Sequence, residues 1–256
     1  PFYGLNQLPS FLSPFSNELM FELKFLKTYL NNYLKENLNL NQRRDYWIYD
    51  GIQMFIMMQY ADEYFPELKM TGNVANLKIL KSYHFINLDF NQQYNYLYML
   101  MARKNLDQAL NEPKNRLIKF NEQIASKYRA GLSLKYLDSY LGNDIVHKTI
   151  KEYIQENQYL GTNSRQFETV LIKNSPKDID WFFRTVIETR DLIDYKFGKI
   201  IKEKDSLTFT IKNNNKTTVP IPVFGVKNKQ VLFKKWLENI KTDSTFTVPK
   251  TGYDKI

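Results

Sequence analysis

The chain contains no cysteine, only two histidines and no long apolar run. Without cysteine it can form neither a disulfide nor a thiolate metal site. No stretch approaches the ~18 consecutive apolar residues of a membrane-spanning helix, so we expect no membrane span. No targeting segment is visible, which leaves the compartment open between cytoplasm and cell envelope. We expect a piece of a longer protein that carries other domains.

Arginine is missing from the C-terminal quarter of the chain. Residues 194–256 hold 13 Lys against 6 acidic residues and account for +7 of the net charge of +9. Recognition of nucleic-acid phosphates and bases usually recruits arginine forks and stacking aromatics. Lysine alone is more typical of a solvated strand edge that resists aggregation. We therefore expect no nucleic-acid binding, and contact with an acidic protein partner is the alternative for this region.

The residues that are present predict two parts with different periodicity. At 256 residues, with 43% hydrophobic content, the chain can bury a sizeable core. Apolar residues recur at helical spacing up to about residue 193 and alternate from Asp194 onwards. We therefore expect a mainly α protein, with a helical domain over 1–193 followed by a small, truncated β-sandwich-like domain over 194–256.

The element boundaries follow from capping and turn residues. Ser16 or Asn17 is suited to cap the first helix, and Ser175-Pro176 suggests a cap followed by proline at the first helical position. Residues 74–88 give no clear pattern. The predicted helices are 18–38, 47–65, 94–106, 114–127, 128–142, 144–154, 164–171 and one from 176. The predicted strands are 195–197, 207–211, 219–226, 231–233 and 245–248, with Pro220 and Pro222 making the third an edge strand.

Asp50 is the most informative residue of the helical part. It directly precedes Gly51 in a helix that is apolar on nearly every face, which is typical of a buried helix. A carboxylate on the first turn of such a helix needs a cation, a cluster of hydrogen-bond donors or a metal. The methionines from Met54 to Met58 are expected to fill the core.

Several strings, in order, resemble the catalytic domain of the aminopeptidase N family of gluzincin zinc peptidases. WIYDGIQMF at 47–55 resembles the family string W-L-N-E-G-F-A-x-Y, in which the glutamate is the third zinc ligand. YRAGLSLKYLDSYLG at 128–142 is similar to its Y-x-K-G block, and further similarities are NDIVHKTIKEYI at 143–154 and KDIDWFF at 177–183. The resemblance covers most of residues 18–250 and implies a thermolysin-like helical portion followed by a β-sandwich.

The resemblance also implies that the zinc site has been lost. In the family, an H-E-x-x-H helix supplies two ligands and a general base, with 18 residues between its second histidine and the glutamate. Counted back from Asp50, these positions hold Lys27, Thr28 and Asn31 in place of the two histidines and the base. Tyr128 matches the tyrosine that stabilises the oxyanion in the family, but the lysine that follows that tyrosine is here Ala130.

These replacements suggest a structural substitute for the metal. Our hypothesis is an ion pair between Lys27 and Asp50, supported by hydrogen bonds from Thr28, Asn31 and Tyr128. The alternative is that both charged side chains are partly solvated in an open cleft. Asp50 is the only ligand-like position that is kept, so we expect no bound cofactor and no catalytic residues.

The predicted function is a non-catalytic pseudopeptidase that binds a peptide or protein. One alternative is a divergent zinc aminopeptidase with metal ligands supplied elsewhere; the other is the Lys-rich interaction module. Both histidines, His84 and His147, are expected to be ordinary side chains, and Asp178 and Asp180 to be first-turn acids of a helix. The Lys/Asn-rich composition without cysteine favours a bacterial source.

Overall fold

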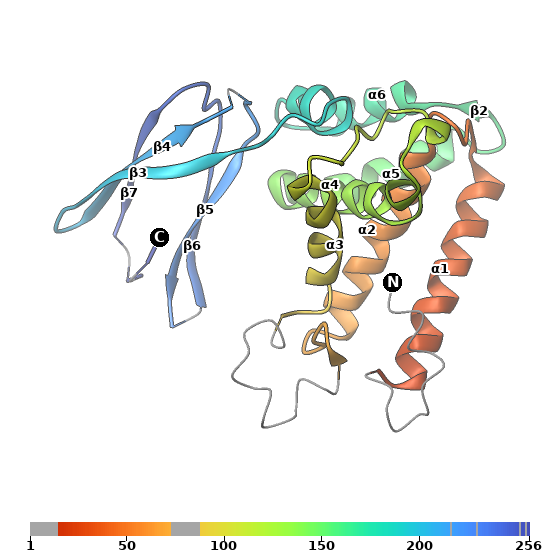
Figure 1. Ribbon diagram of the computed structural model, residues 1–256, viewed down its shortest axis with the longest axis horizontal. Coiled ribbons are helices and arrows are strands. Elements are labelled where there is room, and N and C mark those ends of the chain that lie inside the picture. Colours follow the sequence, from red (N-terminus) through yellow and green to blue (C-terminus); the bar gives the residue numbers. More distant parts are fainter. Residues whose placement is uncertain (1–14, 73–87, 216, 229, 251, 254) are drawn as a thin grey trace. The chain divides into compact units, whose positions relative to one another are not determined.

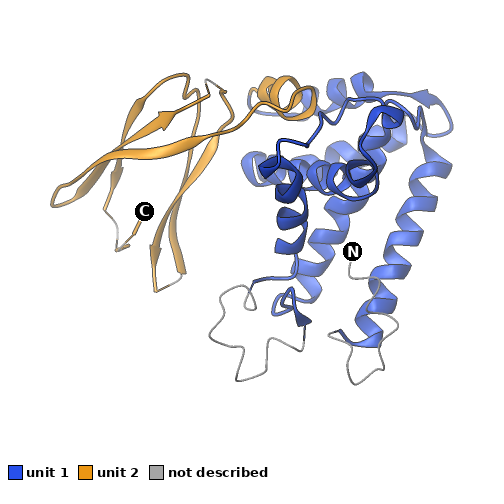
Figure 2. Cartoon of the chain, in the orientation of Figure 1, with its two compact units in different colours: residues 1–177 blue, residues 178–256 orange. Residues whose placement is uncertain are grey.

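The computed structural model describes residues 15–72, 88–215, 217–228, 230–250, 252–253 and 255–256. The chain divides into two compact units, Pro1–Lys177 and Asp178–Ile256 (Figure 2). The first unit is built of helices and the second is dominated by antiparallel strands. The boundary between the units precedes residue 193, because the segment with Phe182–Ile187 groups with the strands. Within the described part of the chain, no helix is long and apolar enough to cross a membrane.

Helix α1 (Asn17–Asn37) begins where its cap was predicted. The Ser16 hydroxyl accepts a hydrogen bond from the backbone amide of Leu19, which satisfies one of the free N–H groups of the first turn. The buried side of α1 consists of leucines at helical spacing, namely Leu19, Leu23, Leu30 and Leu34. In Figure 1, α1 lies at one side of the first unit, with α2 next to it.

Helices α2 (Tyr46–Tyr64) and α4 (Ser126–Leu141) pack closely at the centre of the first unit. A Cβ atom on Gly131 would lie 2.4 Å from the Cβ of Met54, so only glycine fits at this crossing. A Cβ on Gly51 would lie 3.3 Å from the Cβ of Ala130. Small residues on both helices therefore let the two backbones approach. Met54, Met57 and Met58 are buried, which confirms their predicted place in the core.

The other helices of this unit are α3 (Gln92–Arg103), α5 (Ile145–Glu156) and α6 (Ser164–Asn174). Gly142 ends α4 with a positive φ of 67°, as predicted. The helical stretches predicted over 114–127 and 128–142 are continuous, because a π-helical segment, Asn121–Ala125, runs directly into α4. A short 3-10 turn, Lys114–Arg116, precedes it. Residues 74–87 of the ambiguous segment and His84 lie outside the described residues.

The predicted cap at Ser175-Pro176 is also wrong. Ser175 ends α6, and its hydroxyl accepts a hydrogen bond from the amide of Lys177 instead of starting a helix. The next helical segment includes the π-helical residues Phe182–Ile187. Asp178 accepts a hydrogen bond from the amide of Asp180, so this carboxylate stabilises the start of that segment as a first-turn acid would.

Two short parallel strands connect distant parts of the first unit. Strand β1 (Asn39–Leu40) follows α1 and pairs with β2 (Gly161–Thr162), which precedes α6. The buried side chain of Asp45 accepts a hydrogen bond from the amide of Ser164, on the first turn of α6. These contacts fix the ends of α1, α2 and α6 against one another.

The second unit contains two antiparallel sheets around one core. Strands β3 (Tyr195–Lys202), β4 (Ser206–Asn213) and β7 (Ser244–Pro249) form one sheet in the order β3-β4-β7. Strands β5 (Ile221–Lys227) and β6 (Gln230–Leu237) form the other, so the proline-bearing strand lies at an edge as predicted. Side chains from both sheets share the core, including Phe209, Val223, Leu237 and Val248. This arrangement agrees with the predicted helical part followed by a small sheet region.

Candidate functional site

Asp50 lies on the first part of α2, where that helix faces α4. Its side chain is only 17% exposed, and one carboxylate oxygen lies 3.8 Å from Nζ of Lys127 on α4. A salt bridge at this distance, with a lysine that is one-third exposed, is a loose one. The structure therefore assigns the ion pair to Lys127, which the sequence reasoning did not single out.

Several lysines act on the Asp50 carboxylate through their positive charges. Burial raises the pKa of the Asp50 carboxyl above its ordinary value, and the positive charges of lysines oppose that rise. In decreasing order of effect, these are Lys127, Lys114, Lys35 and Lys27. They come from α4, from the 3-10 turn and from two positions on α1. The influence of Lys27, the predicted partner, on the pKa of this carboxyl is the smallest of the four.

Lys27 also has a structural role through its backbone. Its carbonyl oxygen accepts a hydrogen bond of 2.8 Å from the side-chain amide of Gln53 on α2. Gln53 is itself buried, so this bond fixes α1 against α2 close to Asp50. The position of the Lys27 backbone is therefore set by α2, whatever its ammonium group contacts.

The hydrogen bonds of Thr28 and Asn31 lead to other residues of α1. The Thr28 hydroxyl donates to the carbonyl of Lys24 on its own helix, and the Asn31 amide donates to Asn32. Tyr128 is a core residue whose ring lies 4.8 Å from that of Tyr94, centroid to centroid. The supporting network that we predicted for a Lys27–Asp50 pair thus remains a hypothesis.

The donor set at these positions does not fit a zinc ion. Lys27 brings a positive charge and Asn31 a neutral amide where two imidazoles would be needed. Among the residues that the structure describes, no three His, Cys, Asp or Glu side chains form a group that could hold a metal ion. We derive no catalytic step that depends on a metal.

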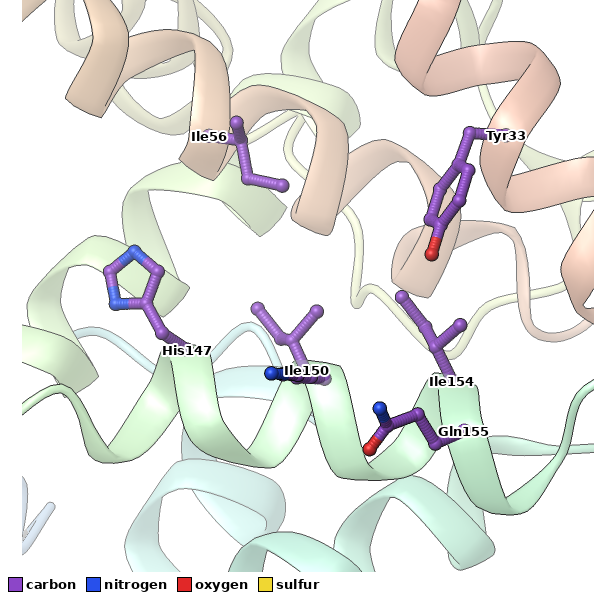
Figure 3. Close-up of a pocket in the computed structure, with 7 residues that line it drawn as sticks. Tyr33, Ile56, His147, Ile150, Ile154 and Gln155 are labelled. Carbon is purple, nitrogen blue, oxygen red and sulfur yellow. The ribbon is translucent and has the colours of Figure 1, made fainter.

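A cavity of about 280 Å³ lies on the side of α5 that faces α1 and α2 (Figure 3). Tyr33 of α1 and Ile56 of α2 point toward α5 in this view. The remaining lining residues belong to α5: His147, Ile150, Lys151, Ile154 and Gln155. His147 contacts the side chain of Gln59 through Nε2, and its ring lies 5.0 Å from Phe55. The imidazole is thus part of the cavity wall, a role that its place in the sequence did not indicate.

Some of the residues that were not predicted were recognisable in the sequence, and others were not. Lys35, Lys114 and Lys127 come together only through tertiary packing, so no local pattern connects them. A row of aromatic residues on α1, at a regular spacing of four, was visible in the sequence and is exposed in the structure. Its geometry is described below.

Similarity to known proteins is found among solved structures. No protein-family model matches the chain, and no curated protein matches it. The crystal structure of Legionella pneumophila aminopeptidase A in complex with aspartic acid is similar at 14% sequence identity and a TM-score of 0.49. The alignment covers 79% of this chain and 21% of that one, so the chain spans about a fifth of that protein's length. A likeness at this level establishes neither a family nor an activity.

Proposed function

We propose that this chain is a non-catalytic, peptide- or protein-binding pseudopeptidase module. The proposal begins from the ordered strings that resemble a zinc peptidase and from the residues that replace its ligands, Lys27 and Asn31. The observation that carries it is the ion pair of the largely buried Asp50 carboxylate with Lys127. A peptidase site would hold a divalent cation beside this carboxylate, whereas this chain places an ammonium group 3.8 Å from it.

The charge at this site favours one class of ligand. Lys127 is one-third exposed beside Asp50, and the chain as a whole carries a net charge of +9. Ammonium groups that are only partly buried attract carboxylates without the full desolvation cost of a closed site. The favoured ligand is therefore a peptide segment that presents acidic side chains or its terminal carboxylate.

Metal content is the first measurement that tests the loss of catalysis. The purified chain should contain near-zero zinc by mass spectrometry, and added zinc should leave its melting temperature unchanged. Stoichiometric zinc that is lost in Asp50→Ala would instead support the divergent aminopeptidase. Peptide hydrolysis would then be the next assay.

A matched pair of peptides tests the binding site. We would measure, by fluorescence anisotropy, the binding of a labelled peptide with two aspartates and of the same peptide with asparagines. The acidic peptide should bind more tightly, and Lys127→Ala should weaken its binding several-fold. Lys151→Ala is the control, because it removes one exposed lysine on α5, away from Asp50. Equal losses in both variants would mean that only net charge matters, and the proposed site would be wrong.

A further inference from the structure

Four aromatic side chains form a continuous exposed row along α1. Phe21, Phe25, Tyr29 and Tyr33 are 70%, 63%, 55% and 39% exposed, respectively. Consecutive ring centroids lie 6.3, 6.4 and 5.9 Å apart, with interplanar angles of 21°, 15° and 17°. We call these four residues the aromatic ladder. Their spacing of four residues places each ring above the previous one on the helix surface.

The ladder is larger than the apolar surface that a helix usually leaves in water. An aromatic side chain can bury ~150–250 Å², so the exposed parts of the four rings amount to roughly 450 Å². Patches of about this size on soluble proteins often mark interaction sites. The leucines that bury α1 lie on another side of the helix, so the ladder takes no part in the core described for this unit.

The ladder leads to the cavity beside α5. Tyr33 is both the last ring of the ladder and a wall of the cavity, opposite Ile154 of α5 (Figure 3). The cavity volume of about 280 Å³ is slightly below the range of small-molecule sites, ~300–1,000 Å³. It suits a single large apolar side chain, and the isoleucines that line it supply the apolar contact.

Size and spacing decide the kind of occupant. A stable dimer interface buries about 800 Å² on each partner, nearly twice the area of the ladder, so a second copy of this chain fits poorly. The repeat of about 6 Å between rings equals the rise of four residues in an α-helix. Side chains at i, i+4 and i+8 of a partner helix would keep the same period and pack between successive rings.

The charges beside the ladder add a polar requirement. Glu18, Glu22 and Glu36 each lie three residues from a ring of the ladder, a helical spacing that makes them neighbours of those rings. Tyr60 of α2 donates a hydrogen bond of 2.9 Å to Glu22, which orients that carboxylate. Lys24 is at the same spacing from Phe21 and Lys151 lines the cavity, so three acidic residues stand against two basic ones.

We propose that the aromatic ladder and the adjoining cavity are a docking surface for an amphipathic helix of a partner protein. That helix carries apolar residues at intervals of four, one large apolar anchor for the cavity, and lysines or arginines beside them that meet the glutamates. This surface differs from the proposed peptide site at Asp50. Lys27 follows Phe25 by two residues, about 200° around the helix, so the two sites use different sides of α1.

The test uses a synthetic peptide as the probe. We would label a peptide of about 18 residues, ~27 Å long as a helix, with leucines at intervals of four, one tryptophan anchor and flanking lysines. The double variant Phe25→Gln, Tyr29→Gln should weaken its binding at least tenfold, measured by fluorescence anisotropy. Both side chains are largely exposed, so far-UV circular dichroism and the melt should not change.

Two control variants and two altered probes give the test its specificity. Ile172→Gln removes an exposed apolar side chain from α6 and should leave binding within twofold. A scrambled probe without the helical face, and a probe with glutamates in place of lysines, should both bind at least tenfold more weakly. Lys127→Ala should leave the helical probe unaffected, which separates this surface from the proposed peptide site.

Other outcomes would overturn the proposal. Unchanged binding in the double variant, or equal binding of the scrambled probe, would show that the ladder does not dock a helix. Tight binding of the acidic probe would contradict the role of the glutamates. A dimer detected by light scattering and lost in Phe25→Gln, Tyr29→Gln would mean that a second copy of this chain covers the ladder.

Discussion

The crossing of α2 and α4 and the surroundings of Asp50 lie on the same two helices but are built in opposite ways. At the crossing, Gly51 and Gly131 bring the helices together over buried methionines. At Asp50, one carboxylate faces lysines from three elements, and the nearest ion pair spans 3.8 Å. The first region is close-packed and apolar, and the second is loose and charged.

The two regions therefore differ in how well they tolerate substitution. The strings at 47–55 and 128–142 contain the glycines and apolar residues of the helix crossing, where any added atom must displace a neighbour. The positions that correspond to the zinc-binding helix, Lys27, Thr28 and Asn31, are partly or fully exposed on α1. Substitutions at such exposed positions cost little packing energy, whereas substitutions at the helix crossing cost more.

The largest expected effect on stability comes from adding a Cβ atom at the crossing of α2 and α4. Gly131→Ala should destabilise the chain by about 3 kcal/mol, because the added Cβ would lie 2.4 Å from the Cβ of Met54 and 3.2 Å from its backbone. Neither α2 nor α4 can move without disturbing the core. Urea unfolding followed by circular dichroism measures the loss.

Gly161→Ala provides the matched control for this prediction. A Cβ on Gly161 would meet nothing within 4 Å, so its substitution should change the free energy of unfolding by less than about 0.5 kcal/mol. If both alanine variants were equally stable, the α2–α4 crossing would be looser than described. The contrast between the two regions would then disappear.

Local sequence signals predicted the elements whose ends are set by nearby residues. Ser16 caps α1 through the amide of Leu19, and Gly142 ends α4, as their positions in the sequence indicated. The same logic failed at Ser175, where the serine hydroxyl bonds to Lys177 in a turn. At Asn121–Ala125 the predicted helix forms as a π-helical segment that continues into α4.

The candidate site was harder to predict than the fold because its members are far apart in the chain. Asp50 was recognisable as a carboxylate on an apolar helix, yet its partner Lys127 is 77 positions away on α4. A resemblance to a known motif pointed to Lys27 instead, since it compares positions and not distances. Only the packing of α2 on α4 shows that Lys127 has a larger effect on the pKa of Asp50 than Lys27 has.

A pair of alanine variants tests this assignment. Lys127→Ala should cost about 1 kcal/mol of stability, because the cation with the largest effect on the partly buried Asp50 is lost. Lys27→Ala should cost less, since its influence on that carboxyl is the smallest of the four lysines. Alanine is the best helix former, so neither change is penalised by helix propensity.

The order of the two losses decides between two descriptions of the site. A cost for Lys27→Ala of about 3 kcal/mol or more would restore the direct Lys27–Asp50 pair as the substitute for a metal. A cost for Lys127→Ala that is indistinguishable from zero would mean that Asp50 is solvated. Urea unfolding of both variants at the same pH and ionic strength measures the order.

The smallest expected effect concerns the charge of Asp50 itself. Burial raises the pKa of this carboxyl above the ordinary 3.8, so the folded chain binds its proton more tightly than the unfolded chain does. Ionisation of Asp50 therefore lowers stability as the pH rises from about 3.8 through the folded-state pKa. Asp50→Asn cannot ionise and should gain stability relative to the parent chain over this window.

Comparing the two chains by urea unfolding at a series of pH values isolates this contribution, because all other titrating groups are shared. The difference should be small below pH 3.8 and should favour Asp50→Asn at neutral pH. The opposite sign at neutral pH would show that the lysines outweigh burial and hold Asp50 as a tight ionic centre. The Asp50 region would then resemble the helix crossing in being closely fitted, with charge in place of apolar packing.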